Sequence, residues 1–243
     1  MLKRIEFPAF AAFNPVAMYQ PSPFEVAQEP PPVPVLPETL LLLELEAQER
    51  CIDLRRVSRI VLADLGATMQ VLRLSARELS DFDGPVRIED CISELGIWPC
   101  IEAMTAETSS QDIRYAAINN FWRHSRDVAQ HARLIAEEML EVNPDQAYMA
   151  GLLHEIASLP ALLGWRDRWL EESSYNAPNL VARWSLPRFV AEFFNEGHSG
   201  ASSASWPEIV RMAHRLSVQS CIHPVAAQEN RSMVYAGLIA TAM

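Results

Sequence analysis

Residues 147–163 read AYMAGLLHEIASLPALL, which places a histidine and a glutamate side by side in an otherwise apolar stretch. The run is rich in helix formers and shows no alternation of apolar and polar residues. It therefore predicts a buried helix that bends or stops near Pro160. Ionisable groups are rarely buried in such a helix unless they are paired or bound. The pair His154–Glu155 is accordingly a metal site, the remains of one, or a local ion pair.

Helical patterns continue on both sides of this stretch. Asn143 and Pro144 offer an N-cap and a first helical residue just before it. Upstream, a long helix is expected through 112–141, with an apolar stripe that includes Val128 and Ile135. Further helices are expected at 38–50, 53–65 (with Asp53 as N-cap), 67–79 (after a break at Gly66), 87–96, 97–108, 179–184, 187–194, 206–220 and 224–243. No segment alternates as a strand would, so the predicted fold class is all-α.

Composition restricts the classes of function. The chain has 243 residues, of which 49% are hydrophobic and 21% charged, as is typical of a soluble globular protein. Its net charge of −11 argues against nucleic acid as a partner, and no Lys/Arg block is visible. No apolar run approaches the roughly 20 residues that cross a bilayer. Four cysteines without C-x-x-C spacing indicate reduced thiols. We expect a cytoplasmic protein with no membrane partner.

The distribution of proline separates an N-terminal segment from the rest of the chain. Nine of the 17 prolines lie in residues 1–37, which are expected to form an extended arm or linker. Because this arm also contains several aromatic residues, a strap packed on the domain is the alternative interpretation. Residues 38–107 are predicted to form one helical subdomain and residues 108–243 a second.

A histidine beside a carboxylate offers one nitrogen and one oxygen ligand, a combination that suits Zn, Mn or Fe. Two ligands do not complete a site, so others must come from elsewhere in the chain. The candidates by composition are His124, His198 and His214. The sequence contains no H-E-x-x-H, no G-x-S-x-G elbow and no glycine-rich phosphate loop. These absences leave a metal centre as the favoured chemistry, if the chain has any.

Three segments together carry a family resemblance: FWRHSRDVAQHARLIAEEM at 121–139, AYMAGLLHEIASLPALL at 147–163 and ARWSLPRFVAEFF at 182–194. They resemble the HDOD family, a branch of the HD-domain superfamily, and the likeness extends over about residues 35–220. The resemblance implies an HD-superfamily-like multi-helix domain. In the superfamily, His and Asp side chains hold one or two divalent metals that activate water for phosphate-ester hydrolysis. Many HDOD proteins are instead thought to be signalling modules without this activity.

Matched to the family's pattern, the chain retains only part of the ligand set. The residues that the resemblance assigns to a metal site are His124, His154, Glu155 and His198. Glu155 stands where the family has Asp, Ser173 where it has a histidine, and Gly197 where it has the first of two adjacent histidines. His214 stands where the family has a second Asp, which counts as the loss of a carboxylate. The missing ligands favour a vestigial site over a working one.

These observations lead to a non-catalytic HDOD-type module of bacterial signal transduction that acts through contacts with a protein partner and needs no cofactor. The alternative is a metal-dependent phosphohydrolase acting on a nucleotide or other phosphate ester, with Zn, Fe or Mn at the four residues above. A pocket that binds a small nucleotide or other ligand without turnover is the third possibility. It has the least support, because no cluster of basic residues stands out in the sequence.

Overall fold

The computed structural model describes residues 33–79, 87–108, 115–139, 142–163, 177–194 and 206–222, and no strand occurs in them. The helices of the first half are α1 (Pro37–Ala47), α2 (Leu54–Leu62), α3 (Leu65–Glu78), α4 (Ile88–Leu95) and α5 (Ile97–Thr108). Those of the second half are α6 (Tyr115–Glu137), α7 (Pro144–Leu153), the 3-10 turn η1 (Ile156–Ser158), α8 (Leu159–Leu162), α9 (Ala177–Arg183), α10 (Arg188–Glu192) and α11 (Trp206–Ile222). The all-α prediction is confirmed. The expected helix at 224–243 lies outside the described residues.

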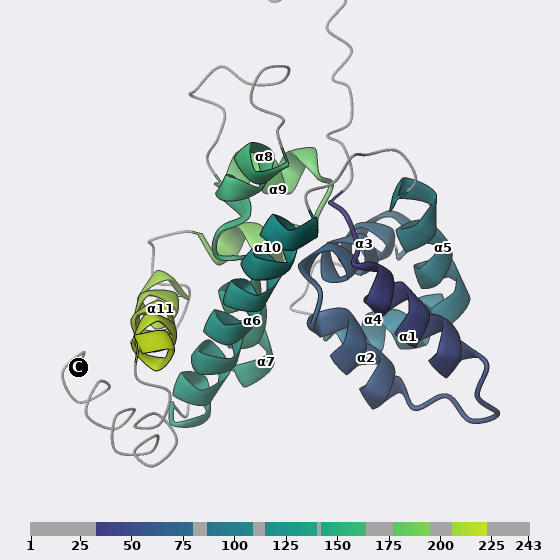
Figure 1. Ribbon diagram of the computed structural model, residues 1–243, viewed down its shortest axis with the longest axis horizontal. Helices are drawn as coiled ribbons and strands as arrows, with labels where there is room; N and C mark the ends of the chain where they lie inside the picture. Colours follow the sequence, from purple (N-terminus) through teal and green to yellow (C-terminus); the bar gives the residue numbers. More distant parts are fainter. Residues whose placement is uncertain are drawn as a thin grey trace, which may run out of the picture.

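Figure 1 shows α1 to α5 gathered on one side of the long helix α6, with α7 and α11 packed along α6 and α8 to α10 at one end. The main apolar core runs through α1 to α5 and continues into α6, α7, α9 and α10. A smaller apolar cluster joins α6, α7 and α11 through Val128, Ile135, Ile209 and Leu216. No helix in the described ranges combines the length and apolar character needed to cross a membrane.

Asp64 connects three separate parts of the chain. It is fully buried and caps the N-terminus of α3 by accepting a hydrogen bond from the backbone N–H of Ala67 (3.1 Å). Its carboxylate also accepts from the backbone N–H of Leu36 (2.8 Å) and from the indole N–H of Trp122 on α6 (2.8 Å). One side chain thus joins the segment before α1, the start of α3 and the long helix α6.

Gly66 was expected to mark the break between the second and third helices, and that prediction is wrong. The break falls at Ala63 and Asp64, and Gly66 is the second residue of α3. Its lack of a side chain serves packing instead, because a Cβ there would collide with the backbone carbonyl of Pro34. Residues 33–36, at the end of the proline-rich arm, are buried and form no helix, and the backbone of Leu36 is extended. This part of the arm therefore packs as a strap, while residues 1–32 lie outside the described part.

The helix that carries the histidine–glutamate pair begins as predicted but ends earlier. The side chain of Asn143 caps α7 by accepting from the backbone N–H groups of Asp145 (2.9 Å) and Gln146 (3.2 Å). However, α7 ends at Leu153, and Pro160 lies in the short helix α8 rather than at a stop. The backbone turns at Glu155, whose φ is −105° and ψ 25°. His154 and Glu155 consequently lie in a turn and not in mid-helix.

The helices α6 and α7 approach each other closely at Gly151. A Cβ placed there would lie 2.7 Å from the Cα of Ala129 and 3.1 Å from the Cβ of Ala132. Small residues on both helices therefore set how near the turn after α7 comes to α6. This spacing brings the side chains after Leu153 within reach of those on α6.

Candidate metal centre

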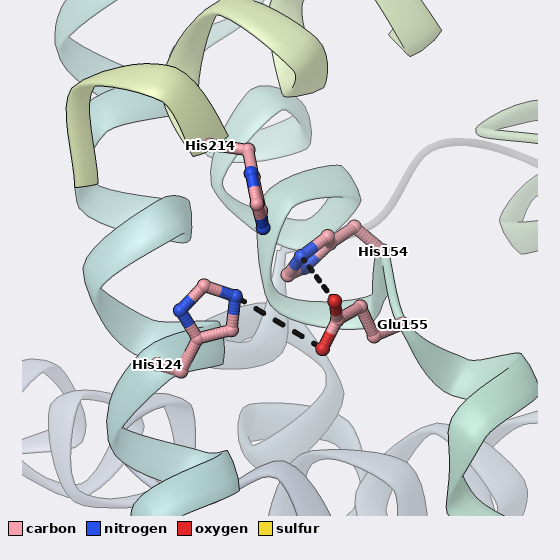
Figure 2. A group of neighbouring side chains, drawn as sticks. All are labelled: His124, His154, Glu155 and His214. Carbon is pink, nitrogen blue, oxygen red and sulfur yellow. Dashed lines mark ion pairs between the residues drawn. The ribbon is translucent and has the colours of Figure 1, made fainter. Parts of the chain in front are cut away.

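Four potential ligands converge where α6, the end of α7 and α11 meet (Figure 2). His124 comes from α6, His154 and Glu155 come from the turn after α7, and His214 comes from α11. One ligand atom from each residue can be chosen so that all four lie within 4.8 Å of one another. The three imidazole rings are 5.1 to 5.6 Å apart between centroids.

His154 is the most constrained member of the cluster. Its Nδ1 lies 2.8 Å from the carbonyl oxygen of Gly151. Because a carbonyl oxygen only accepts, Nδ1 carries the proton and donates it, and Nε2 is left with a lone pair. The side chain is 8% exposed, and Nε2 is buried without a hydrogen-bond partner among the described residues. Burial lowers the pKa of His154 to about 4, an effect that the charge of Glu155 partly opposes. At neutral pH the ring is therefore uncharged, the form in which imidazole binds a metal.

Glu155 lies between two of the histidines. Its Oε1 is 3.8 Å from Nε2 of His154, and its Oε2 is 3.9 Å from Nε2 of His124. Both distances, drawn as dashed lines in Figure 2, exceed that of a good hydrogen bond, so no hydrogen bond joins Glu155 to either histidine. A buried ring nitrogen with no partner, facing a carboxylate and two further imidazoles, is an arrangement that a cation would satisfy. The residues present therefore fit a metal ion.

The donor set favours particular metals. Three nitrogen ligands and one carboxylate suit Zn, Fe or Mn, whereas Ca and Mg prefer oxygen donors throughout. In a tetrahedral site with metal–ligand bonds of about 2.0–2.2 Å, the donor atoms lie about 3.4 Å apart. The observed limit of 4.8 Å is wider, so a bound ion would draw the four side chains together.

The structure brings together three of the four residues that the sequence assigned to a metal site, namely His124, His154 and Glu155. The fourth, His198, lies outside the described residues, as do Ser173 and Gly197. Among the described residues, the fourth member of the cluster is His214.

His214 is the potential ligand that the family resemblance did not assign to the site. By the family's pattern, His214 only replaces an aspartate, which is the loss of a carboxylate. In the structure, its imidazole lies beside those of His124 and His154. A signal for this was present in α11. The buried face of that helix contains Ile209, Ala213 and Leu216, and the half-buried His214 lies next to this face.

Comparisons with known proteins support the assignment of the fold. A family model described as the HDOD domain matches residues 33–180. Two crystal structures of the MmoQ response regulator from Methylococcus capsulatus are similar to this chain at 16% sequence identity. For the structure of its fragment 20–298, the match covers 82% of this chain and 90% of that chain, with a TM-score of 0.58. For the structure at 2.4 Å resolution, it covers 85% and 93%, with a TM-score of 0.61.

A comparison with curated proteins found no match. The similarity to the two crystal structures concerns the fold, because the sequence identity is low. The family model, by contrast, matches more than half of the chain and includes α1 to α8. On this basis the chain belongs to the HDOD domain family.

Proposed function

We propose that this protein is a signal-transduction module of the HDOD type that acts through contacts with other proteins, catalyses no reaction, and holds one divalent transition-metal ion. The observation that carries the metal assignment is the convergence of three imidazoles and one carboxylate around the buried, unpartnered Nε2 of His154. The signalling role has support from the family and from the similar fold of a protein named as a response regulator.

The residues of the cluster have separate roles in holding the ion. His154 would bind through Nε2, while its bond to the carbonyl of Gly151 fixes the tautomer and the orientation of the ring. His124 and His214 would supply the other nitrogen ligands, and Glu155 would supply the negative charge. Because these side chains come from α6, the turn after α7 and α11, a bound ion would connect three parts of the fold.

The number of protein ligands supports a non-catalytic role. Four protein ligands are the usual complement of a closed structural zinc site, whereas a catalytic site keeps one position open for water or substrate. The cluster also contains a single carboxylate, while hydrolytic sites with two metals need more negative charge to hold them. Glu155 is one methylene longer than the Asp of the family, which shifts its oxygens within the cluster.

A metal-dependent phosphohydrolase is the second candidate, and partial exposure of the cluster favours it. The side chains of His124 and Glu155 are 30% and 35% exposed, so a substrate could reach them. A bound divalent metal would supply Lewis acidity towards a phosphate ester.

Metal analysis of the purified full chain tests the proposal. After loading with Zn, Mn or Fe and removal of free metal, we expect one ion per chain, measured by mass spectrometry. His154→Ala should abolish binding, whereas the control His131→Ala, on α6 but outside the cluster, should leave it intact. Failure of the loaded wild type to retain metal would show that the cluster is vestigial.

The same samples decide between the two candidate functions. The loaded protein should hydrolyse neither bis(p-nitrophenyl) phosphate nor nucleoside phosphates. Turnover that His154→Ala abolishes and His131→Ala retains would replace the non-catalytic proposal with the phosphohydrolase.

A further inference from the structure

A cleft lined by four arginines lies between α1, α2 and α6. Its volume is about 540 Å³, and its cationic residues are Arg56 and Arg59 from α2 and Arg123 and Arg126 from α6. We call it the arginine cleft. It is separate from the metal centre, none of whose residues lines it.

Helical spacing explains why the arginines gather there. The lining residues from α2 and its C-cap, Ala63, follow the i, i+3, i+4, i+7 pattern of one helix face: Arg56, Arg59, Ile60 and Ala63. The residues of α6 follow the same pattern: Asn119, Trp122, Arg123 and Arg126. Each helix thus presents two arginines three positions apart, and the two faces are opposed across the cleft.

Most of this positive charge is not neutralised by carboxylates. Arg56 forms an ion pair with Glu46 at 2.8 Å. Arg59 donates instead to the backbone carbonyl of Arg55 (3.2 Å), and Arg123 donates to the side-chain oxygen of Asn120 (3.1 Å). Among the described residues no carboxylate pairs with Arg59, Arg123 or Arg126.

The charge of the cleft opposes that of the chain as a whole. In the described residues Glu38 is the one carboxylate that lines the cleft, against four arginines. The chain has a net charge of −11. A concave site with an excess of positive charge raises the local concentration of anions, and this bias is selective on an otherwise acidic protein.

The rest of the lining is mainly apolar, with Thr39 and Asn119 as its uncharged polar residues. Leu36, Leu42, Ile60 and Ala63 line the cleft beside the arginines, and Leu42 is 46% exposed. The volume falls within the range of small-molecule sites, which combine apolar walls with a few polar groups that orient the ligand. A guanidinium group binds phosphate through two parallel hydrogen bonds and also stacks on flat rings.

We propose that the arginine cleft binds a small organic phosphate of nucleotide size, with its phosphates on the arginines and its apolar part against Leu42 and Ile60. This inference goes beyond the proposed function, since it needs neither the metal nor a protein partner. An acidic segment of a partner protein is the other anion that could use the cleft, and the test separates the two.

Isothermal titration calorimetry of the full chain at low ionic strength, with ATP, GTP and pyrophosphate as probes, tests the proposal. At least one nucleoside triphosphate should bind more tightly than pyrophosphate, because only the nucleotide also covers the apolar wall. The double variant Arg59→Ala/Arg126→Ala should bind at least about tenfold more weakly. The variant Arg59→Lys/Arg126→Lys keeps the charge but loses the paired hydrogen bonds that a guanidinium group makes to phosphate. Its affinity should lie between those of the wild type and the alanine variant.

Two controls separate this site from the rest of the molecule. Arg183→Ala/Arg188→Ala removes the same charge from exposed positions on α9 and α10 and should bind like the wild type. His154→Ala should also bind like the wild type, so the result does not depend on the metal centre. Thermal melting establishes that each variant is folded.

Several outcomes would overturn the inference. The first is that no probe binds, which would leave an acidic protein segment as the occupant of the cleft. The second is that pyrophosphate binds as tightly as either nucleotide, which would show that the apolar wall is not used. The third is binding that persists in the folded Arg59→Ala/Arg126→Ala variant or disappears in His154→Ala, because the anion would then lie elsewhere.

Discussion

Replacing Asp64 with asparagine should destabilise the fold even though the change is nearly isosteric. Asp64 accepts hydrogen bonds from two backbone N–H groups and from the indole of Trp122, and the side chain of Thr39 also bonds to it. An asparagine can keep its oxygen on the side of Ala67 and Trp122. Its amide group would then face the N–H of Leu36, so that two donors meet where a donor and an acceptor met before.

The magnitude follows from this mismatch. Leaving a buried donor without an acceptor costs about 1–3 kcal/mol; here the Leu36 N–H loses its acceptor, and the new amide group places a second donor against it. Burial raises the pKa of Asp64, which its hydrogen bonds oppose, so removing the charge recovers part of the loss. We expect a net decrease of about 2–3 kcal/mol in the free energy of unfolding. Asp64→Ala, which leaves every donor unpaired, should cost about 4 kcal/mol or more.

Urea denaturation followed by circular dichroism at 222 nm measures this effect. The matched control is Asp53→Asn, because Asp53 also caps a helix, α2, but is exposed. Asparagine and aspartate cap helices about equally well, so the control should change stability by less than about 0.5 kcal/mol. If Asp64→Asn behaved like this control, the view that Asp64 holds three segments together through its two oxygens would be refuted.

Two further predictions concern the second half of the fold. Gly151→Ala should lower the free energy of unfolding by about 1–3 kcal/mol, because the added Cβ would lie 2.7 Å from the Cα of Ala129. An unchanged melting temperature would contradict the close approach of α6 and α7. Zinc at about 100 times its Kd should raise the melting temperature of the wild type by about 5–10 °C and that of His214→Ala by much less. An equal rise in both proteins would exclude His214 as a ligand.

The sequence predicted the helices well where local signals determine them. Asp53 and Asn143 were identified as N-caps, and both accept the expected backbone hydrogen bonds. The sequence predicts the end of α7 too late, because Pro160 is the one stop signal that it shows there. The chain instead leaves the helix at His154, where the ring bonds back to Gly151 and the backbone turns at Glu155.

The candidate site was partly predictable for a similar reason. His124, His154 and Glu155 lie in segments with strong family patterns, and the structure places them together. His214 lies in a region where the family pattern expects a carboxylate; the apolar pattern of α11 indicates that it borders a buried face, but its place beside His124 and His154 depends on how α11 packs on α6.

The arginine cleft could not be predicted from local patterns. Its two pairs, Arg56 with Arg59 and Arg123 with Arg126, come from helices far apart in the sequence, so no basic run is visible. The sequence analysis accordingly gave little support to a ligand pocket. Long-range packing, which juxtaposes α2 and α6, is what creates the concentration of charge.

The hydrogen bonds between the two halves of the molecule have a thermodynamic consequence for this cleft. Trp122 on α6 donates to Asp64, and the hydroxyl of Tyr148 on α7 donates to the carbonyl of Leu62 at the end of α2 (3.0 Å). The first bond ties α6 to the turn that follows α2, and the second ties α7, which packs on α6, to the last residue of α2. The backbone that carries the four arginines is therefore preorganised, and a ligand need order only their side chains, which reduces the entropy lost on binding.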